Sequence, residues 1–408
     1  MADKNRRDVL KLLGFVGVTW AATQLLKGTP AAGPTPPANA SPTLLDWLPA
    51  YFDDTRANIV QRNGQRALLS SHLYPKATFI RDAFYGPVAL DDLSLSVDCY
   101  QWFAHTQYPS GQIRTAVPFE PADDPLFPPG DDDSTLLFII WSAWLRRNRR
   151  PIDLGPIERA YTFVRAHVRD EEFITPASAF CYWADTVQFE RPERIAHNQG
   201  LYVLALKGLQ LLGVGNVSDQ QVAAAKDRYA SFYRSDLGTL TLGKDSWWAD
   251  KLDLSVLFPE FLLRWLYTDT ALPDAVIQST LDRFLKVAVV NKPDGTLSGL
   301  KIICHPDGSF IDRQRFFEPG LNWPGDYHNG GYWPMYTLTA LAMLYRLNGD
   351  ADLARLIEQL ITVELAPDRR SKEVIILSPG AVGSVNPARS GYTWNALIVP
   401  ALKWANLT

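Results

Sequence analysis

The hydrophobic residues of this chain recur mainly with the period of an amphipathic α-helix, and strand-like alternation is scarce. Twelve stretches follow the helical period, and we predict helices at residues 43–61, 83–92, 94–106, 134–147, 156–168, 198–212, 218–233, 253–267, 273–289, 332–347, 351–363 and 393–407. The pattern therefore predicts an all-α protein.

The connections between these predicted helices alternate between short and long. Links of a few residues alternate with long segments such as 107–133, 169–197 and 290–331. Short links place consecutive helices side by side and antiparallel, so we expect six helical hairpins whose long connections emerge on one face. An open solenoid would have uniform links and similar repeats, and no repeat is visible in the sequence. We therefore predict a closed (α/α)6 toroid, with residues 41–408 as one domain.

The first forty residues have the layout of an export signal rather than of a folded segment. Arg6 and Arg7 precede an apolar stretch at 12–26 and a Pro/Ala-rich segment that ends at Ala40. The paired arginines resemble the twin-arginine export motif. We predict a signal peptide and linker at residues 1–40, export by the twin-arginine machinery and a periplasmic or extracellular location; an uncleaved N-terminal membrane anchor is the alternative.

Charge and cysteine usage narrow the classes of partner. The formal net charge of -4 gives no basic field that would recruit nucleic acid. Cys99, Cys181 and Cys304 lack the spacing of a zinc site or of a dense disulfide framework, which leaves a single bridge open. The acidic residues at 123–124 and 131–133 are compatible with calcium but are more typical of a solvated loop. We expect a monomer without metal or cofactor.

Aromatic and polar residues gather where each long connection meets the next helix. The chain has 13 Trp, 16 Tyr and 19 Phe, and aromatic faces complement the apolar faces of pyranose rings. The segments in question are 80–82, 129–134, 181–185, 244–250, 323–333 and 391–394. Carboxylates, indoles and a histidine without a Gly-rich phosphate loop favour a neutral, polyhydroxylated ligand. The alternative is that the acids and amides are helix N-caps, a role open to Asp133 and Asn198.

The order of these segments resembles the six-hairpin glycosidases, above all the bacterial and archaeal glycogen-debranching type, with kinship to trehalases, processing α-glucosidases and neutral invertases. The likeness spans about residues 80 to 400. The matching segments are Arg81-Asp82, Gly111-Gln-Ile-Arg-Thr115, Asp133-Ser-Thr-Leu-Leu-Phe138, Tyr182-Trp-Ala-Asp185, Ile195-Ala-His-Asn-Gln-Gly-Leu-Tyr202 and His328-Asn-Gly-Gly-Tyr-Trp-Pro334.

The resemblance implies a role for each matching residue. Asp185 falls at the position of the family's general acid, and Glu373, about twenty residues before Trp394, is taken as the base, with Glu318 and Glu364 as runners-up. The residues expected to bind sugar hydroxyls or to line subsites are Arg81, Asp82, Asp133, Trp183, His328, Asn329, Trp333 and Trp394; for Trp333 and Trp394 a place in the core is nearly as plausible.

Glycoside hydrolysis needs two carboxyl groups in two different environments. One protonates the departing oxygen and the other activates water or attacks the anomeric carbon. Asp185, beside Tyr182 and Trp183, is expected to have a raised pKa, whereas Glu373 stays ionised. A base that activates water implies inversion with carboxylates roughly 6.5 to 9.5 Å apart, and a separation near ~5 Å would imply retention.

The sequence therefore predicts an exported hydrolase of glycosidic bonds, with α-glucosides favoured by the resemblance. Two alternatives stay open at this stage. A sugar epimerase on the same fold would use histidines as proton shuttles, and only His197 and His328 lie at loop ends. A catalytically inactive carbohydrate-binding or polysaccharide-assembly protein would keep the aromatic residues and lack one acid.

Overall fold

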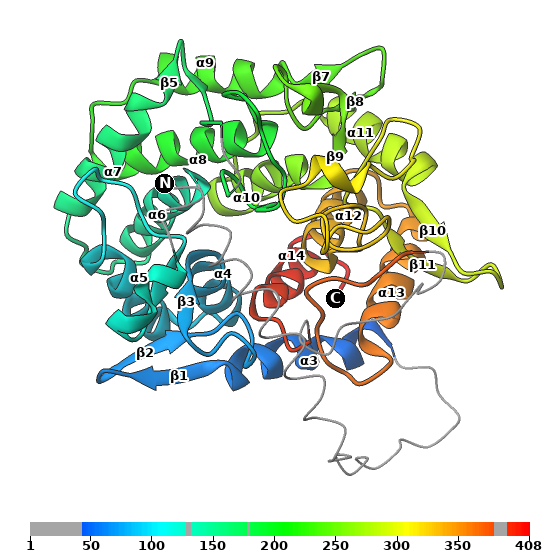
Figure 1. The fold of residues 1–408 in the computed structure, drawn as a ribbon, viewed down its shortest axis with the longest axis horizontal. Coiled ribbons are helices and arrows are strands. Elements are labelled where there is room, and N and C mark those ends of the chain that lie inside the picture. Colours follow the sequence, from blue (N-terminus) through cyan, green and yellow to red (C-terminus); the bar gives the residue numbers. More distant parts are fainter. Residues whose placement is uncertain (1–42, 128–131, 178–179, 379–389) are drawn as a thin grey trace.

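The computed structural model describes residues 43–127, 132–177, 180–378 and 390–408. The predicted export signal at 1–40 lies outside these residues. In the described part the chain forms twelve α-helices, which confirms the all-α prediction (Figure 1). They are α3 (Leu44–Ala57), α4 (Ile80–Leu90), α5 (Leu93–His105), α6 (Asp132–Arg147), α7 (Gly155–Ala166), α8 (Ala196–Leu212), α9 (Asp219–Ala230), α10 (Phe258–Tyr267), α11 (Asp274–Val287), α12 (Pro334–Asn348), α13 (Ala351–Leu365) and α14 (Ile398–Trp404). No helix of the described residues has the length and apolar surface needed to cross a membrane.

Alternate helices build an inner ring. Around the molecule, α4 contacts α6, α6 contacts α8, α8 contacts α10, α10 contacts α12 and α12 contacts α14. The ring closes because the 3-10 turn η8 (Thr393–Leu397), which leads into α14, packs against α4. In Figure 1 the colours accordingly run once round the molecule until red α14 lies beside the blue elements. The (α/α)6 toroid predicted from the alternating connections is confirmed.

Burial separates the inner helices from the outer ones. Helix α8 is buried along nearly its whole length, whereas α9 has only Val222, Ala225 and Tyr229 buried. A helix that is apolar on all sides must be surrounded by other elements, and an amphipathic helix covers them from outside. Helices α3, α5, α7, α9, α11 and α13 therefore form the outer layer.

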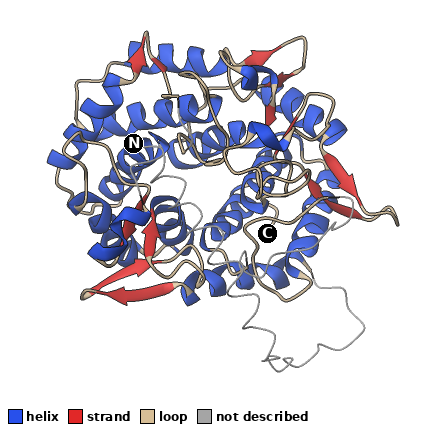
Figure 2. Ribbon diagram, viewed as in Figure 1, coloured by secondary structure: helices blue, strands red, loops and turns tan. Residues whose placement is uncertain are grey.

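Short antiparallel strands, red in Figure 2, lie in the connections between the helices. The pairs are β1 (Ile59–Arg62) with β2 (Gln65–Leu68), β3 (Ala77–Phe79) with β4 (Ala116–Pro118), β5 (Val168–Arg169) with β6 (Glu172–Phe173), β7 (Tyr233–Arg234) with β8 (Thr239–Leu240), β9 (Leu252–Asp253) with β12 (Ile303–Cys304), and β10 (Val289–Asn291) with β11 (Leu297–Leu300). Because β3–β4 and β9–β12 join different long connections, they hold these loops in fixed positions.

Three predicted helices differ from the observed elements for local reasons. Helix α3 ends at Ala57, because the following residues form the β1–β2 hairpin around Asn63-Gly64, whose φ angles of 50° and 76° suit a tight hairpin turn. The predicted helices 253–267 and 393–407 each begin as a 3-10 turn, η5 (Leu254–Leu257) and η8. Pro259 and Pro400 lack the N–H that would continue the α-helical hydrogen bonds into those turns.

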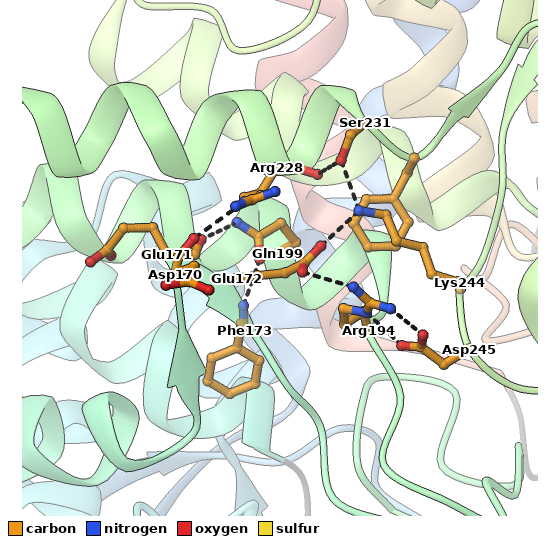
Figure 3. Close-up of polar contacts among 12 residues, drawn as sticks. Asp170, Glu171, Glu172, Phe173, Arg194, Gln199, Arg228, Ser231, Lys244 and Asp245 are labelled. Carbon is orange, nitrogen blue, oxygen red and sulfur yellow. Dashed lines mark hydrogen bonds and ion pairs between the residues drawn. The ribbon is translucent and has the colours of Figure 1, made fainter.

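A buried carboxylate and a network of charges hold the connections around α8. Glu193 accepts hydrogen bonds from the main-chain N–H groups of Lys244, Asp245 and Ser246 at 2.6 to 2.9 Å. Beside it, Arg194 and Lys244 both bind Glu172 of β6, at 3.0 and 2.7 Å, and Arg194 also pairs with Asp245 (Figure 3). The connections before α8 and after β8 are therefore joined to each other.

The ring is also closed by a buried carboxyl group between the first and last elements. Glu364 of α13 accepts hydrogen bonds from the Tyr51 hydroxyl of α3 (2.5 Å), the Lys372 main-chain N–H (2.9 Å) and the Asn395 amide of η8 (2.9 Å). Its side chain is fully buried, and this burial raises its pKa to about 7, against the opposing effect of these hydrogen bonds. A residue so placed ties three segments that are far apart in the sequence.

We predict that Glu364→Ala lowers the free energy of unfolding by roughly 2 to 4 kcal/mol, because three buried donors lose their acceptor. Glu364→Gln keeps an acceptor oxygen for Lys372 and Asn395 and a polar group for Tyr51, so it should be tolerated. Because the folded-state pKa of Glu364 is raised, its contribution to stability is present at low pH and is lost as pH rises through about 7.

The measurement is urea unfolding followed by tryptophan fluorescence between pH 5 and 8. Stability of the Gln variant should vary less with pH than that of the unaltered protein. Equal pH dependence of the two proteins would contradict the assignment.

Candidate functional site

The predicted site residues gather at the end of the ring where the long connections meet the inner helices. Arg81 and Asp82 lie in the first turn of α4, Asp133 lies in the first turn of α6, and Trp333 is the N-cap residue of α12. Trp394 belongs to η8. Since these are the N-terminal ends of neighbouring inner helices, ring closure brings them together.

Arg81 and Asp133 form a buried bidentate ion pair at the centre of this end. The guanidinium Nη2 lies 2.9 Å from both Asp133 carboxylate oxygens, and Nε lies 3.1 Å from Oδ2. The Asp133 side chain is 1% exposed and that of Arg81 is 10% exposed. Asp133 therefore serves mainly to orient Arg81, and contact of either residue with a ligand stays a prediction.

Asp82, next to Arg81 in the chain, faces a different set of groups. Its Oδ2 accepts a 2.5 Å hydrogen bond from the Ser70 hydroxyl, and the side chain is buried. Burial raises the pKa of Asp82 to about 7, and Ser70 and Arg81 oppose that rise. Burial is the main cause that raises the pKa of the Tyr392 hydroxyl, and the negative charges of Glu373 and Asp82 raise it further. Tyr392 is therefore close to both carboxyl groups. Asp82 thus lies on the Glu373 side of the site.

Asp185 lies in the connection that precedes α8. Its Oδ1 is 3.7 Å from His328 Nδ1 and has no hydrogen-bond donor among the residues described. Burial raises the pKa of Asp185 to about 6; Arg81 opposes the rise and Glu318 adds to it. The side chain is still 36% exposed, so protein surrounds the carboxyl group but leaves it open on one side. A carboxyl group in this setting retains its proton at higher pH than an ordinary aspartate.

His328 and its neighbours fix the position of the Asp185 loop. His328 Nδ1 is 2.7 Å from the Thr186 hydroxyl, which donates to Asn322 Oδ1 at 3.2 Å. Asn329 is fully buried, and its amide bonds the main chain of Ile311 and Asn322 at 2.7 to 3.0 Å. Asn329 therefore holds together the connection that precedes α12. His328 has no exposed surface.

Three predicted indoles form a continuous aromatic layer beneath the carboxyl groups. Trp183 lies 5.1 Å from Trp333, which lies 5.9 Å from Trp394, measured between ring centroids. Trp333 also stacks on His328 at 5.0 Å, and Trp183 packs on Tyr336 at 4.2 Å. All three indoles are at most 5% exposed. They accordingly make up the floor of the site, in agreement with the core alternative considered for Trp333 and Trp394.

The Trp183 indole is anchored from below by a buried acid. Its Nε1 donates to the Ser255 hydroxyl, and Ser255 donates from both its hydroxyl (2.7 Å) and its main-chain N–H (2.9 Å) to Asp253. Asp253 is fully buried, and its pKa is raised to about 7 by that burial. This chain of hydrogen bonds fixes the indole that precedes Asp185 by two residues.

The three glutamates considered for the base occupy different environments. Glu364 is engaged in ring closure, as described above, and is therefore removed from the candidates. Glu373 is buried beside Tyr392, and Glu318 is partly exposed near Asp185. Of the three, Glu373 lies near Asp82, since the charges of both act on Tyr392.

The acidic residues considered for calcium whose side chains are described, Asp123, Asp124 and Asp133, are engaged with cations. Asp123 pairs with Lys76 at 2.8 Å and Asp124 with Arg114 at 2.6 Å, while Asp133 binds Arg81. Asp131 lies outside the described residues. Within the part of the chain that is described, no group of three or more His, Cys, Asp or Glu is arranged to hold a metal ion, and the three cysteines are free and buried. The disulfide left open by the sequence is therefore not formed.

Several residues that shape the site were not anticipated from the sequence. Tyr336 follows Trp333 by three residues and so shares its helix face, a spacing that was available as a signal. Thr186 was also missed, although it directly follows Asp185 in the sequence. Ser70, Asp253 and Ser255 gave no signal, because none of them belongs to the segments in which aromatic and polar residues gather.

No protein-family model matches the sequence, and neither does any curated protein. Solved structures share its fold. A wild-type glycosidase matches 89% of this chain and 96% of its own with a TM-score of 0.59 at 14% identity. The GH63 mannosylglycerate hydrolase from Thermus thermophilus, in complex with glucose, matches 88% of this chain and all of its own (100%) with a TM-score of 0.58 at 10% identity.

A bacterial glucoamylase complexed with acarbose matches 81% of this chain and 49% of its own, with a TM-score of 0.53 at 13% identity. At such identities the likeness concerns the fold alone. The chain has the (α/α)6 fold found in six-hairpin glycosidases.

We predict that Arg81→Met lowers the free energy of unfolding by about 3 to 5 kcal/mol, because it leaves the buried Asp133 carboxylate without its counter-charge. Adding Asp133→Leu should recover part of this loss. Urea unfolding of both single variants and the double variant gives the coupling energy. The exposed pair Arg234–Asp236, whose side chains are 47% and 61% exposed, is the matched control, and Arg234→Met should cost less than ~0.5 kcal/mol. Additive effects at Arg81 and Asp133 would contradict the pairing.

Proposed function

We propose that this protein is a glycoside hydrolase that cleaves its substrate with inversion, using Asp185 as general acid and Glu373 as general base. The observation that carries the proposal is Asp185, a carboxyl group that protein surrounds but leaves 36% exposed and whose pKa is raised. Glu373 lies near Asp82, since the charges of both act on Tyr392. An acid that keeps its proton can protonate the departing glycosidic oxygen, and an ionised partner can activate water.

The environment of Asp185 is the one that the mechanism needs for its acid. Asp185 has no hydrogen-bond donor to its Oδ1 among the described residues, and the negative charge of Glu318 disfavours its ionised form. Arg81, fixed by Asp133, is near both Asp185 and Asp82, since its positive charge lowers the pKa of each. A fixed positive charge beside an acid of raised pKa supports a hydrolase in which Asp185 is the proton donor.

The solved structures with this fold support the same class of chemistry. The named neighbours are glycosidases, one in complex with glucose and another with acarbose. We infer an oligo- or polysaccharide substrate with α-glucosidic linkages from the sequence resemblance to the debranching type. Export to the periplasm or beyond stays a prediction that rests on residues 1–40.

The burial of the two histidines argues against the epimerase alternative. His197 is 1% exposed, and its Nδ1 lies 3.0 Å from the Ser255 carbonyl oxygen. Burial lowers the pKa of His197 to about 3, so the ring stays neutral in the interior. A proton shuttle must reach its substrate, and neither His197 nor the fully buried His328 is exposed.

The test is a screen of the purified protein against maltose, isomaltose, trehalose, sucrose, maltotriose and α-glucosyl fluoride. We expect Asp185→Asn to lower kcat on the best sugar substrate by roughly 10²- to 10⁴-fold, because the leaving oxygen is no longer protonated. The loss on glucosyl fluoride should be much smaller, since fluoride departs without a proton. Glu373→Gln should lower both rates, because both reactions need activated water.

Glu190→Gln, which alters an exposed residue of the same connection, is the control for the Asp185 variant. NMR of the first product should show the inverted anomer. Unchanged activity of Asp185→Asn would refute the acid assignment, and a product of retained configuration would refute the inverting mechanism.

The pH dependence gives an independent prediction. Because Asp185 must be protonated, kcat should fall as pH rises through about 6. Glu318 raises the pKa of Asp185, so Glu318→Gln should move this fall to lower pH while retaining most of the activity at the optimum. The Glu190→Gln control should leave the profile unchanged. Complete loss of activity in Glu318→Gln at every pH would instead identify Glu318 as the base.

A further inference from the structure

Trp323, in the connection between β12 and α12, is 51% exposed, and with Trp247 it is one of two exposed tryptophans among the described residues. The guanidinium carbon of Arg313 lies 3.7 Å from the centroid of its ring. Arg313 thus covers one face of the indole by a cation–π contact. The exposed surface of Trp323 is therefore the opposite face and the edge.

Trp323 is held next to the loop that carries Asp185. The preceding residue, Asn322, is fully buried and accepts a hydrogen bond from the Thr186 hydroxyl at 3.2 Å. In the same segment, the Phe317 main-chain N–H donates to the Thr186 carbonyl oxygen at 2.7 Å. Thr186 directly follows Asp185, so the exposed indole and the carboxyl group belong to two loops joined by side-chain and main-chain bonds.

We propose that Trp323 is the stacking platform of a leaving-group subsite that takes a pyranose ring. The inference rests on the proposed function. A general acid must lie beside the departing oxygen, so the part of the substrate beyond that oxygen lies on the Asp185 side of the site. The substrate is then a disaccharide or longer glycan, rather than a glycoside with a small leaving group.

The other indoles of the site do not offer such a surface. Trp183, Trp333 and Trp394 are at most 5% exposed, with their rings packed on one another and on Tyr336 or His328. Trp323 combines a half-exposed indole with a segment bonded to Thr186, the residue directly after Asp185. The other exposed indole, Trp247, is linked to the same connection less directly, because the next residue, Trp248, donates from Nε1 to the Gln188 carbonyl oxygen at 2.9 Å. The apolar face of a pyranose fits on an indole face, and the burial of that surface is favourable.

Arg313 makes the platform more rigid and extends it. Its guanidinium fixes one indole orientation, so less side-chain freedom is lost when a sugar binds. Arg313 forms no ion pair with any acid of the described residues, although Glu318 lies in the same segment. Its N–H donors are therefore available to sugar hydroxyl groups at the edge of the ring.

Trp247 provides a matched control. It is 37% exposed and carries Arg315 at 4.7 Å and Lys251 at 3.9 Å from its ring centroid. Its segment is fixed by Glu193, which binds the main-chain N–H groups of residues 244–246. It meets the Asp185 connection at Gln188, through the Trp248 indole, and not at Thr186. A general effect of removing an exposed, cation-stacked indole would appear at both tryptophans.

The experiment compares Trp323→Ala, Trp323→Phe and Trp247→Ala on the best disaccharide of the screen and on α-glucosyl fluoride. Trp323→Ala should lower kcat/KM for the disaccharide by about tenfold, through KM, because a stacking contact is lost. Its kcat/KM for glucosyl fluoride should not change. Trp323→Phe should retain most of the disaccharide activity, and Trp247→Ala should behave as the unaltered protein on both substrates.

Binding without turnover gives a second measure. In the Asp185→Asn background, calorimetric titration with the same disaccharide should show about tenfold weaker binding when Trp323→Ala is added, and no change with Trp247→Ala. Equal losses on both substrates, or undiminished disaccharide binding, would overturn the subsite while leaving the hydrolase intact. If the unaltered protein hydrolyses no glycoside in the screen, the proposed function fails, and the subsite fails with it.

Discussion

Closure of the helical ring is the constraint on which the rest of the structure depends. The turn η8 packs against α4, and buried Glu364 joins α3, the Lys372 segment and η8 through three hydrogen bonds. Without this closure the first turns of α4 and α6 would not face the connection that carries Asp185. The polar groups that hold the ring together are buried, so each must be paired, and their pairing selects one arrangement of the ends.

Burial shapes both the floor of the site and its acid–base properties. The aromatic layer of Trp183, Trp333 and Trp394 excludes water from beneath the carboxyl groups. The same desolvation raises the pKa of Asp185 to about 6 and that of Asp82 to about 7. A single packing arrangement therefore supplies rigidity and raises the pKa of both carboxyl groups, and Arg81 limits how far both values rise.

The scaffold and the chemistry are determined by different parts of the chain. Solved structures that share 10% to 14% of their residues with this chain have the same fold, because helix packing depends on the pattern of apolar positions more than on particular side chains. The connections, in contrast, carry Asp185, Glu373 and the exposed Trp323. Substrate preference should accordingly vary with the loops while the ring remains.

The sequence by itself determined the twelve helices, their alternation of short and long connections, and the ends at which polar residues gather, because helical periodicity and turn signals are local. The hairpin at Asn63-Gly64 and the breaks before Pro259 and Pro400 were also encoded locally, though the helix prediction overran them.

Only the tertiary structure decided that Asp133 pairs with Arg81, that Glu364 closes the ring, and that the predicted subsite indoles are buried while Trp323 is exposed. These outcomes depend on contacts between residues 52 to 313 positions apart, which exist only once the helices pack into the ring.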